Sequence, residues 1–427
     1  MKILIVGSGA REHALAWRLA RSGHVVLAAP GNPGSARVAR RLAVDALDVP
    51  AMVEAARAEA VDLVVVGPEG PLVAGLVDAL AADGIAAFGP TRAAARLEGS
   101  KVFAKEFMAR HRIATAAFRV ADTVEAAVDA ARALGWPAVL KADGLAAGKG
   151  VVIAANESEA RAFATACLIE HRFGDAGARL VVEAFLPGDE ASVFFLCDGT
   201  RLARFVPARD AKRLADGDAG PNTGGMGAFA PAPVDAATLD RIEREIALPT
   251  LAGMAAEGAP FRGLLYVGAM LGPAGPRVLE YNVRFGDPET QALMPLVASD
   301  LGTLFAECAR GELRSPLVFA DAVAVGVVLA AAGYPDAPRA GDPIAGLERW
   351  PAPEVEDREE RWCFHAGTRE LGGGFASAGG RVLTVVARAP DLAGARRRAY
   401  EGLDRLRLAG GQARRDIAAA GAAAARS

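Results

Sequence analysis

The first hundred residues alternate short apolar runs with segments of helical pattern, and this alternation restricts the possible folds more than any other feature. The runs at 3–6, 25–27, 63–66 and 85–88 predict strands, and the segments 12–21, 51–60 and 72–82 predict helices. Strands that alternate with helices form parallel βαβ units. We therefore expect an α/β protein that begins with a doubly wound parallel sheet.

Three turns follow these predicted strands, namely Gly7-Ser8-Gly9, Pro30-Gly31-Asn32 and Gly67-Pro68-Glu69. Ligands of open α/β sheets bind at the carboxyl ends of the strands. The first turn opens a helix, which suits a phosphate group with Arg11 assisting. A dinucleotide-binding turn needs Gly or Ala where Glu12 stands and an acidic residue after the second strand. Both are missing, so NAD binding is disfavoured.

Composition excludes several classes of protein. The net charge of −3 over 427 residues leaves no basic surplus for nucleic acid and no charged block for a membrane surface. No stretch is long and apolar enough to span a bilayer. The four cysteines lie far apart without paired spacing, which fits a reducing compartment. We expect a cytoplasmic protein without nucleic-acid or membrane partners.

The length suggests two to four domains, and the element pattern indicates three regions. These are 1–100, 101–322 with a lid subdomain at about 121–188, and 323–427. Ser100 is a candidate cap for the first central helix. In the central region, helices are predicted at 101–110, 123–134 and 158–167, and strands at 138–141, 151–154 and 180–183.

The segment Arg277–Phe285 is the most informative part of the chain. Side chains alternate along a strand, so Glu280, Asn282 and Arg284 share one face. The other face carries Leu279, Tyr281, Val283 and Phe285 and is expected to pack on a core. Carboxylate and amide oxygens suit magnesium, and an arginine can clamp an anionic group. The alternative is an amphipathic edge strand facing water, but the turn that follows adds the carboxylates of Asp287 and Glu289.

The run from Lys141 to Gly150 joins two predicted strands and is rich in glycine. Glycines let backbone N–H groups approach phosphates, and Lys141 and Lys149 supply positive charge. Gly144 and Gly148 are too close for a Walker A loop, and Gly150 replaces its hydroxyl residue. A lid over a nucleotide fits better than either a P-loop or a plain glycine turn.

Two further segments are candidates for ligand contacts. The strand and turn at 181–190 could serve as a hinge beside an adenine, although alone it resembles any strand that ends in a turn. The segment 210–227 mixes charge with glycine. Long loops of this kind are either functional or disordered.

Together these motifs resemble the phosphoribosylamine–glycine ligase family of the ATP-grasp superfamily. The runs that carry the resemblance span nearly the whole chain: GSGAREHALAW, APGNPG, VVGPEGPLVAG, LEGSK, LKADGLAAGKG, PNTGGMGAFAP, EYNVRFGDPETQ and FHAGT. The resemblance implies ATP-grasp central domains and a small C-terminal α+β domain. It also implies ATP-dependent ligation of glycine to 5-phosphoribosylamine through glycyl phosphate, in de novo purine biosynthesis. ATP and Mg²⁺ are expected, with Mn²⁺ as the alternative metal, in a monomer.

The resemblance also assigns roles residue by residue. Glu280 and Asn282 match the metal ligands, and Arg284, Lys141, Asp210 and Lys212 are the candidate catalytic residues. The nucleotide contacts would be Lys101, Lys141, Glu183, Phe185, Leu186, Glu190 and Met226. The substrate contacts would be Gly9, Arg11, Asn222, Thr223, Gly224, Gly225, Arg284 and Asp287, with the ribose phosphate near Gly9 and Arg11.

Two positions and one strand depart from the family pattern. Ala211 stands where the family usually has His, which weakens any role for a base there. Ala184 replaces a second hinge glutamate, a loss that is harmless if the backbone makes the contact. The strand 265–270 offers no additional acidic metal ligand. Three other functions stay open: a sibling ATP-grasp enzyme with another acceptor, a nucleotide-sensing protein without turnover, and, least favoured, a dehydrogenase.

Overall fold

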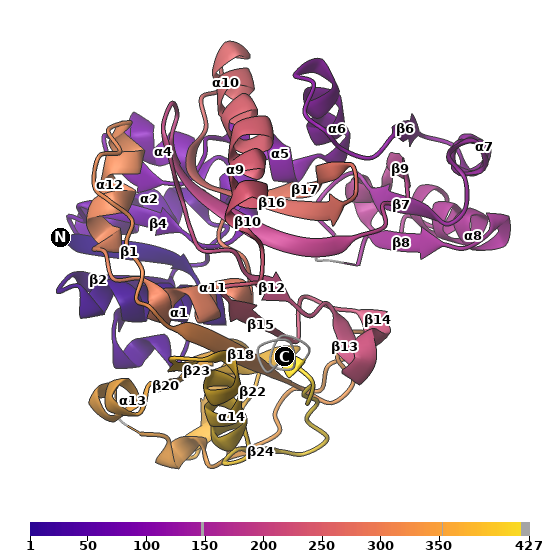
Figure 1. The fold of residues 1–427 in the computed structure, drawn as a ribbon. Coiled ribbons are helices and arrows are strands. Elements are labelled where there is room, and N and C mark those ends of the chain that lie inside the picture. The colour runs from indigo at the N-terminus through magenta and orange to yellow at the C-terminus, as the bar shows by residue number, and fades with distance from the viewer. Residues whose placement is uncertain (147–148, 352, 420–427) are drawn as a thin grey trace.

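The computed structural model describes residues 1–146, 149–351 and 353–419 (Figure 1). The N-terminal sheet is parallel, with strand order β3-β2-β1-β4-β5. Its strands are β1 (Lys2–Gly7), β2 (Val25–Pro30), β3 (Arg40–Arg41), β4 (Leu63–Val66) and β5 (Ala87–Phe88). The expected doubly wound sheet is therefore confirmed.

Both faces of this sheet are buried, as a doubly wound sheet requires. Along β1, Ile3 and Ile5 belong to one hydrophobic core, and Leu4 and Val6 belong to another. The helices of this region are α1 (Ala10–Arg21), α2 (Val49–Ala58), α3 (Glu69–Ala74), α4 (Leu76–Ala82) and α5 (Arg92–Gly99). The single helix predicted at 72–82 is wrong, because Gly75 adopts φ +89° and separates α3 from α4.

A four-stranded sheet with two helices projects from the body of the molecule at the right of Figure 1. Its strand order is β6-β9-β7-β8, all antiparallel, and the helices pack their alanine-rich faces together with it. The elements are β6 (Phe118–Ala121), α7 (Val124–Leu134), β7 (Ala138–Ala142), β8 (Val151–Ala154), α8 (Glu157–Leu168) and β9 (Leu180–Ala184). We call this unit the lid. It is joined to the body through α6 (Lys101–Arg110), which Ser100 caps as expected.

The central sheet has the antiparallel order β11-β10-β16-β17. Its strands are β10 (Asp189–Asp198), β11 (Leu202–Arg204), β16 (Arg262–Gly272) and β17 (Gly275–Asn282), and the nearby helices are α9 (Ala236–Ile242), α10 (Leu248–Ala256), α11 (Glu289–Leu293) and α12 (Leu301–Arg310). β17 carries a bulge at Leu279, since Val278 pairs with Ala269 and Glu280 with Gly268.

The last sheet combines central and C-terminal strands in the order β12-β15-β18-β23-β20. They are β12 (Arg209–Asp210), β15 (Gly227–Ala230), β18 (Val323–Ala330), β20 (Arg361–His365) and β23 (Arg381–Ala389), packed with α14 (Leu392–Leu403). α13 (Pro353–Glu359) precedes β20. Small ribbons are formed by β13 (Arg213–Ala215) with β14 (Ala219–Asn222), β19 (Ile344–Ala345) with β24 (Arg407–Leu408), and β21 (Thr368–Leu371) with β22 (Gly374–Ser377). Strands from before and after residue 323 join in this sheet, so the sheet itself marks no domain boundary at that residue. The boundary predicted there stays a prediction.

None of the helices among the described residues is both long enough and apolar enough to cross a membrane.

Candidate active site

One cavity of about 940 Å³ gathers side chains from the edge of the N-terminal sheet, the lid, the central sheet and the C-terminal region. Sixteen of the predicted site residues line this central cavity: Arg11, Lys101, Lys141, Glu183, Phe185, Leu186, Glu190, Asp210, Lys212, Asn222, Thr223, Gly224, Glu280, Asn282, Arg284 and Asp287. Gly9, Gly225 and Met226 do not line it, and Met226 is fully buried. Segments far apart in the sequence thus meet at a single place.

The bulge in β17 changes which side chains face the cavity. Val278 is fully buried in a hydrophobic core, whereas Leu279 lines the cavity beside Glu280. The strict alternation expected for this strand is therefore wrong at Leu279, because the bulge inserts one residue and shifts the phase. Glu280 and Asn282 face the cavity as predicted.

Glu280 lies among positive charges. The Nζ atom of Lys212 is 3.9 Å from its Oε1 atom. Burial raises the pKa of Glu280, but the charges of Lys212, Lys141 and Lys101 outweigh burial and lower it to about 2. Glu280 is therefore ionised at neutral pH and has an oxygen available for a hard cation.

Arg284 follows β17 and is held by carboxylates from the N-terminal region. Its Nε atom lies 3.0 Å from Glu69 Oε2, and its Nη2 atom lies 2.7 Å from Glu98 Oε1. Nη2 also donates to Asn282 Oδ1 at 3.0 Å. This bond fixes the orientation of the Asn282 amide, so Arg284 both positions its neighbour and lines the cavity.

Lys101 and Lys105 of α6 and Lys141 of the lid strand β7 together line one side of the cavity. Lys141 Nζ lies 2.9 Å from Glu183 Oε1 and donates to the carbonyl of Leu279 at 3.0 Å. Lys105 Nζ lies 2.8 Å from Glu183 Oε2. Burial lowers the pKa of Lys101, against the attraction of Glu280. The Glu183 carboxylate, which was predicted beside an adenine, thus anchors two of these lysines.

The hinge and the glycine loop of the lid border the same cavity. Phe185 lines the cavity and is 41% exposed, so its ring is accessible to a ligand. Lys149 Nζ donates to the carbonyl of Pro335 at 3.0 Å, so the loop contacts the C-terminal region. Gly148, part of the predicted phosphate loop, lies outside the described residues.

Asp210 and Lys212 come from β12 and its end. Lys212 Nζ contacts both Glu190 and Glu280. Burial raises the pKa of Asp210 to about 8, although Lys212 opposes this shift. Ala211 between them is held through its backbone, since its N–H donates to the carbonyl of Gly227 at 2.9 Å.

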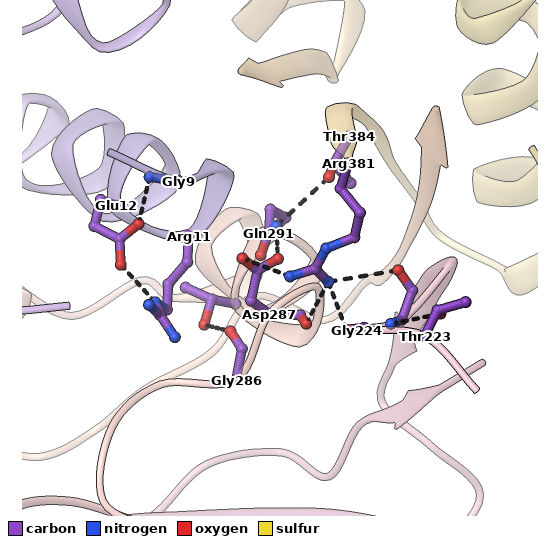
Figure 2. A network of polar contacts seen from close by, with 12 residues as sticks. Gly9, Arg11, Glu12, Thr223, Gly224, Gly286, Asp287, Gln291, Arg381 and Thr384 are labelled. Atoms are coloured by element: carbon purple, nitrogen blue, oxygen red, sulfur yellow. Dashed lines mark hydrogen bonds and ion pairs between the residues drawn. The ribbon is translucent and has the colours of Figure 1, made fainter. Parts of the chain in front are cut away.

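The segment Asn222–Gly225, which we call the substrate loop after its predicted role, is held by a hydrogen bond to Lys212 and by one within the loop. Thr223 N–H donates to the carbonyl of Lys212 at 2.8 Å, and Gly225 N–H donates to Thr223 Oγ1 at 3.0 Å. Asp287 lies next to this loop in Figure 2, where Gln291 Nε2 donates to Asp287 Oδ1 at 2.7 Å.

The first turn of α1 forms the opposite side of this network (Figure 2). Gly9 N–H donates to Glu12 Oε2 at 2.7 Å, and Arg11 Nε donates to Glu12 Oε1 at 2.6 Å. Arg11 Nη1 reaches the carbonyl of Phe285 at 3.1 Å. A Cβ atom at Gly67 would lie 2.2 Å from Glu12 Oε1, so Glu12 fills the space beneath the turns. This packing explains why the position differs from a dinucleotide-binding turn.

Comparison with known proteins agrees with this geometry. Family models described as the N domain, the ATP-grasp (A) domain and the C domain of phosphoribosylglycinamide synthetase match residues 1–98, 99–290 and 324–420. Two proteins named phosphoribosylamine–glycine ligase, from Mesorhizobium japonicum and Phenylobacterium zucineum, are 48% and 49% identical to the chain. The alignments cover 98% of this chain and 97% and 98% of those proteins. The chain belongs to the phosphoribosylglycinamide synthetase family.

Solved structures support this family and its fold. The crystal structure of phosphoribosylamine–glycine ligase from Thermotoga maritima has a TM-score of 0.86 and 37% identity, covering 98% of this chain and 100% of that one. A biotin carboxylase from Campylobacter jejuni shares the fold at TM-score 0.73 and 16% identity, covering 96% of this chain and 92% of that one. The expected arrangement of an N-terminal sheet, an ATP-grasp region and a C-terminal domain is confirmed.

Sequence reasoning missed several residues of this candidate site, among them Glu98, Lys105, Tyr334 and Arg381. Glu98 stands in the quoted run LEGSK, and Lys105 is one helical turn after Lys101, so both had a weak signal. Tyr334 and Arg381 had none, because only the fold of the C-terminal region brings them to the cavity.

Proposed function

We propose that this member of the family catalyses the ATP-dependent ligation of glycine to 5-phosphoribosylamine, an early step of purine biosynthesis. The observation that supports it best is the meeting of Glu280, Asn282 and Arg284 with three lysines across one cavity. Carboxylate and amide oxygens on one side and ammonium groups on the other suit a triphosphate and its metal. The carboxyl ends of the N-terminal parallel strands lie beside these residues, where a second, phosphorylated substrate would bind.

The first chemical step activates a poor electrophile. A carboxylate oxygen of glycine attacks the γ-phosphorus of ATP, the bond from that phosphorus to the bridging oxygen breaks, and ADP leaves. The product is glycyl phosphate. Phosphoryl transfer needs positioning and charge stabilisation more than covalent catalysis. Lys101, Lys141 and Arg284 would supply positive charge, and Lys212 would hold Glu190 and Glu280 in place.

The second step forms the carbon–nitrogen bond. The amine of phosphoribosylamine attacks the acyl carbon, the carbon–oxygen bond to phosphate breaks, and phosphate leaves with release of one proton. Arg11 and Gly9, the substrate loop and Asp287 would bind this substrate, with its phosphate at the start of α1. The lid, with Lys149 on its loop, would keep water from the acyl phosphate.

Glu280 and Asn282 would hold magnesium, with manganese as an alternative. Within the described part of the chain, no group of three or more His, Cys, Asp and Glu side chains is placed to hold a metal. Two protein oxygens fit magnesium, because it usually keeps water and substrate phosphate ligands. When bound, the metal would neutralise charge on the phosphate oxygens.

The nucleotide would lie between the lid and the central sheet. Glu183, Phe185 and Leu186 would border the adenine, and Glu190 the ribose. Met226, which is buried and does not line the cavity, would support the pocket through packing. Ala184, whose N–H donates to the carbonyl of Ala117, can act only through its backbone. We further propose a cytoplasmic monomer with domains at 1–100, 101–322 (lid at about 121–188) and 323–427.

Phosphate release measured with each substrate omitted in turn tests this function. We expect release that requires ATP, glycine and phosphoribosylamine together, with a product of the mass of glycinamide ribonucleotide. Release that persists with another carboxylate or amine, and not with this pair, would favour a sibling ligase. ATP binding without any product would favour a nucleotide sensor.

A further inference from the structure

Arg381 at the start of β23 reaches from the C-terminal region into the central cavity (Figure 2). Its Nη1 atom donates to the carbonyls of Gly224 at 2.5 Å and Asp287 at 2.7 Å. Its Nη2 atom lies 3.1 Å from Asp287 Oδ2. The Arg381 guanidinium therefore joins the substrate loop to the turn that follows β17, the strand of the proposed metal ligands.

Tyr334 holds the same loop through the backbone N–H of Gly224, whereas Arg381 binds the carbonyl of that residue. Gly224 N–H donates to Tyr334 Oη at 2.9 Å, while the Gly224 carbonyl accepts from Arg381. Tyr334 also packs on the residue before Arg381, because a Cβ atom at Gly380 would lie 2.4 Å from its ring. The C-terminal region thus fixes both polar groups of Gly224.

The bonds of Arg381 indicate how it acts. Nη1 and Nη2 are occupied by protein oxygens, so these donors orient the loop and do not need a ligand. Burial raises the pKa of Asp287, but Arg381 opposes burial most strongly and the pKa is lowered overall. Arg381 therefore keeps Asp287 charged beside Arg11, on the sheet-edge side of the cavity.

We infer that Arg381 and Tyr334 are positioning residues that set the substrate loop for the phosphorylated amine substrate. The inference rests on the proposed function, because that function places the amine substrate at this loop. Among the described residues, Arg381 forms no hydrogen bond or ion pair with Lys101, Lys105 or Lys141, on the side of the cavity where the nucleotide would bind. Loss of the arginine should therefore weaken amine binding selectively.

Steady-state kinetics of Arg381→Met, Arg381→Lys, Tyr334→Phe and Arg388→Met test this selectivity. Arg388 is the matched control: it lies on the same strand, pairs with Glu360 at 2.6 Å and donates to the Pro295 carbonyl at 2.8 Å, but does not line the cavity. For Arg381→Met we expect the KM for phosphoribosylamine to rise about tenfold or more, since charge-assisted hydrogen bonds are lost. The KM for ATP should change less than about twofold, and Arg381→Lys should recover part of the loss.

Tyr334→Phe removes a single hydroxyl from a side chain that can stay in place, so it keeps the test valid if Arg381→Met fails to fold. We expect the amine KM to rise about threefold to tenfold for the loss of one hydrogen bond. Equal KM values in Arg381→Met and Arg388→Met, or equal increases for ATP and amine, would overturn the inference. So would an unchanged amine KM in Tyr334→Phe. A wild-type protein without amine-dependent turnover would instead refute the proposed function.

Discussion

Glu98 Oε1 lies 2.7 Å from Arg284 Nη2, and Glu98 Oε2 accepts the N–H of Val283 at 2.7 Å. This carboxylate, at the end of α5, therefore fixes the chain just after the proposed metal strand. Burial raises its pKa to about 7, although Arg284 acts in the opposite direction. The N-terminal region thus holds the residues that the central sheet presents to the cavity.

Replacing Glu98 with alanine should destabilise the protein by about 2–4 kcal/mol, because a buried guanidinium and a buried N–H lose an acceptor. Denaturant unfolding measures this change. Glu98→Gln should cost less than half as much, since it keeps the shape and an acceptor oxygen. Glu106→Ala, at an exposed position of α6, is the control and should stay within about 0.5 kcal/mol of the wild type. Equal stability of Glu98→Ala and Glu106→Ala would contradict this account.

Arg284→Lys should reduce both stability and activity. Arginine contacts Glu69 through Nε and both Glu98 and Asn282 through Nη2, and one ammonium group cannot replace this planar fork. We expect a loss of about 3 kcal/mol or more, from breaking buried ion pairs, together with reduced kcat. Unfolding and turnover should be measured on the same preparation, and a variant with wild-type values for both would exclude this role.

Glu280→Ala should remove magnesium-dependent turnover while leaving the fold intact. Among the described residues its carboxylate pairs with Lys212 and accepts no hydrogen bond from the backbone of a helix or strand, so circular dichroism should be unchanged. We expect kcat to fall by about 100-fold or more, comparable to the loss of one stabilising group at a reacting centre. A magnesium titration of turnover measures this effect, and near-normal activity would count against the metal assignment.

Much of the fold follows from local patterns, whereas part of the site does not. The strands at 63–66 and 151–154 and the helix at 101–110 have the predicted bounds, because apolar periodicity and the Ser100 cap are local signals. Gly75 broke a predicted helix, since the pattern of apolar residues continues across it. The bulge at Leu279 could not be predicted, because it depends on the register with β16.

The proposed site residues show the same division. Glu280, Asn282 and Arg284 could be grouped from one strand, and most other predicted residues do line the same cavity. The carboxylate partners of Arg284, Glu69 and Glu98, lie about two hundred positions earlier in the chain, so their pairing depends on the tertiary fold. Arg381 and Tyr334 reach the cavity only because β23 lies in a sheet with β15 and β18.

Acid should weaken the contact between the N-terminal and C-terminal regions. His13 Nδ1 accepts the N–H of His365 at 2.9 Å, so it must be unprotonated. Burial lowers the pKa of both histidines, to about 3 for His365. An unfolded imidazole has a pKa of about 6.5, so the unfolded state binds more protons below that pH. Stability is therefore full above about pH 6.5 and falls as the pH drops toward 3.

Unfolding free energy measured from pH 6.5 to 5 tests this expectation, because most carboxylates titrate lower. Each buried histidine should contribute a slope approaching about 1.4 kcal/mol per pH unit. His13→Asn keeps an acceptor near the Nδ1 position but cannot titrate. The slope should therefore fall by the contribution of one histidine, about 1.4 kcal/mol per pH unit. His171→Asn, at an exposed position, is the control and should keep the wild-type slope. Identical slopes in the two variants would contradict the prediction.

The fate of the glycine carboxylate oxygens tests the central claim most directly. Wild-type protein would be given ATP, phosphoribosylamine and glycine labelled with ¹⁸O in its carboxylate, and the released phosphate would be analysed by mass spectrometry. If glycyl phosphate forms at this site, one labelled oxygen passes to each phosphate released with the product. Product formation with unlabelled phosphate would contradict activation of the carboxylate by phosphoryl transfer.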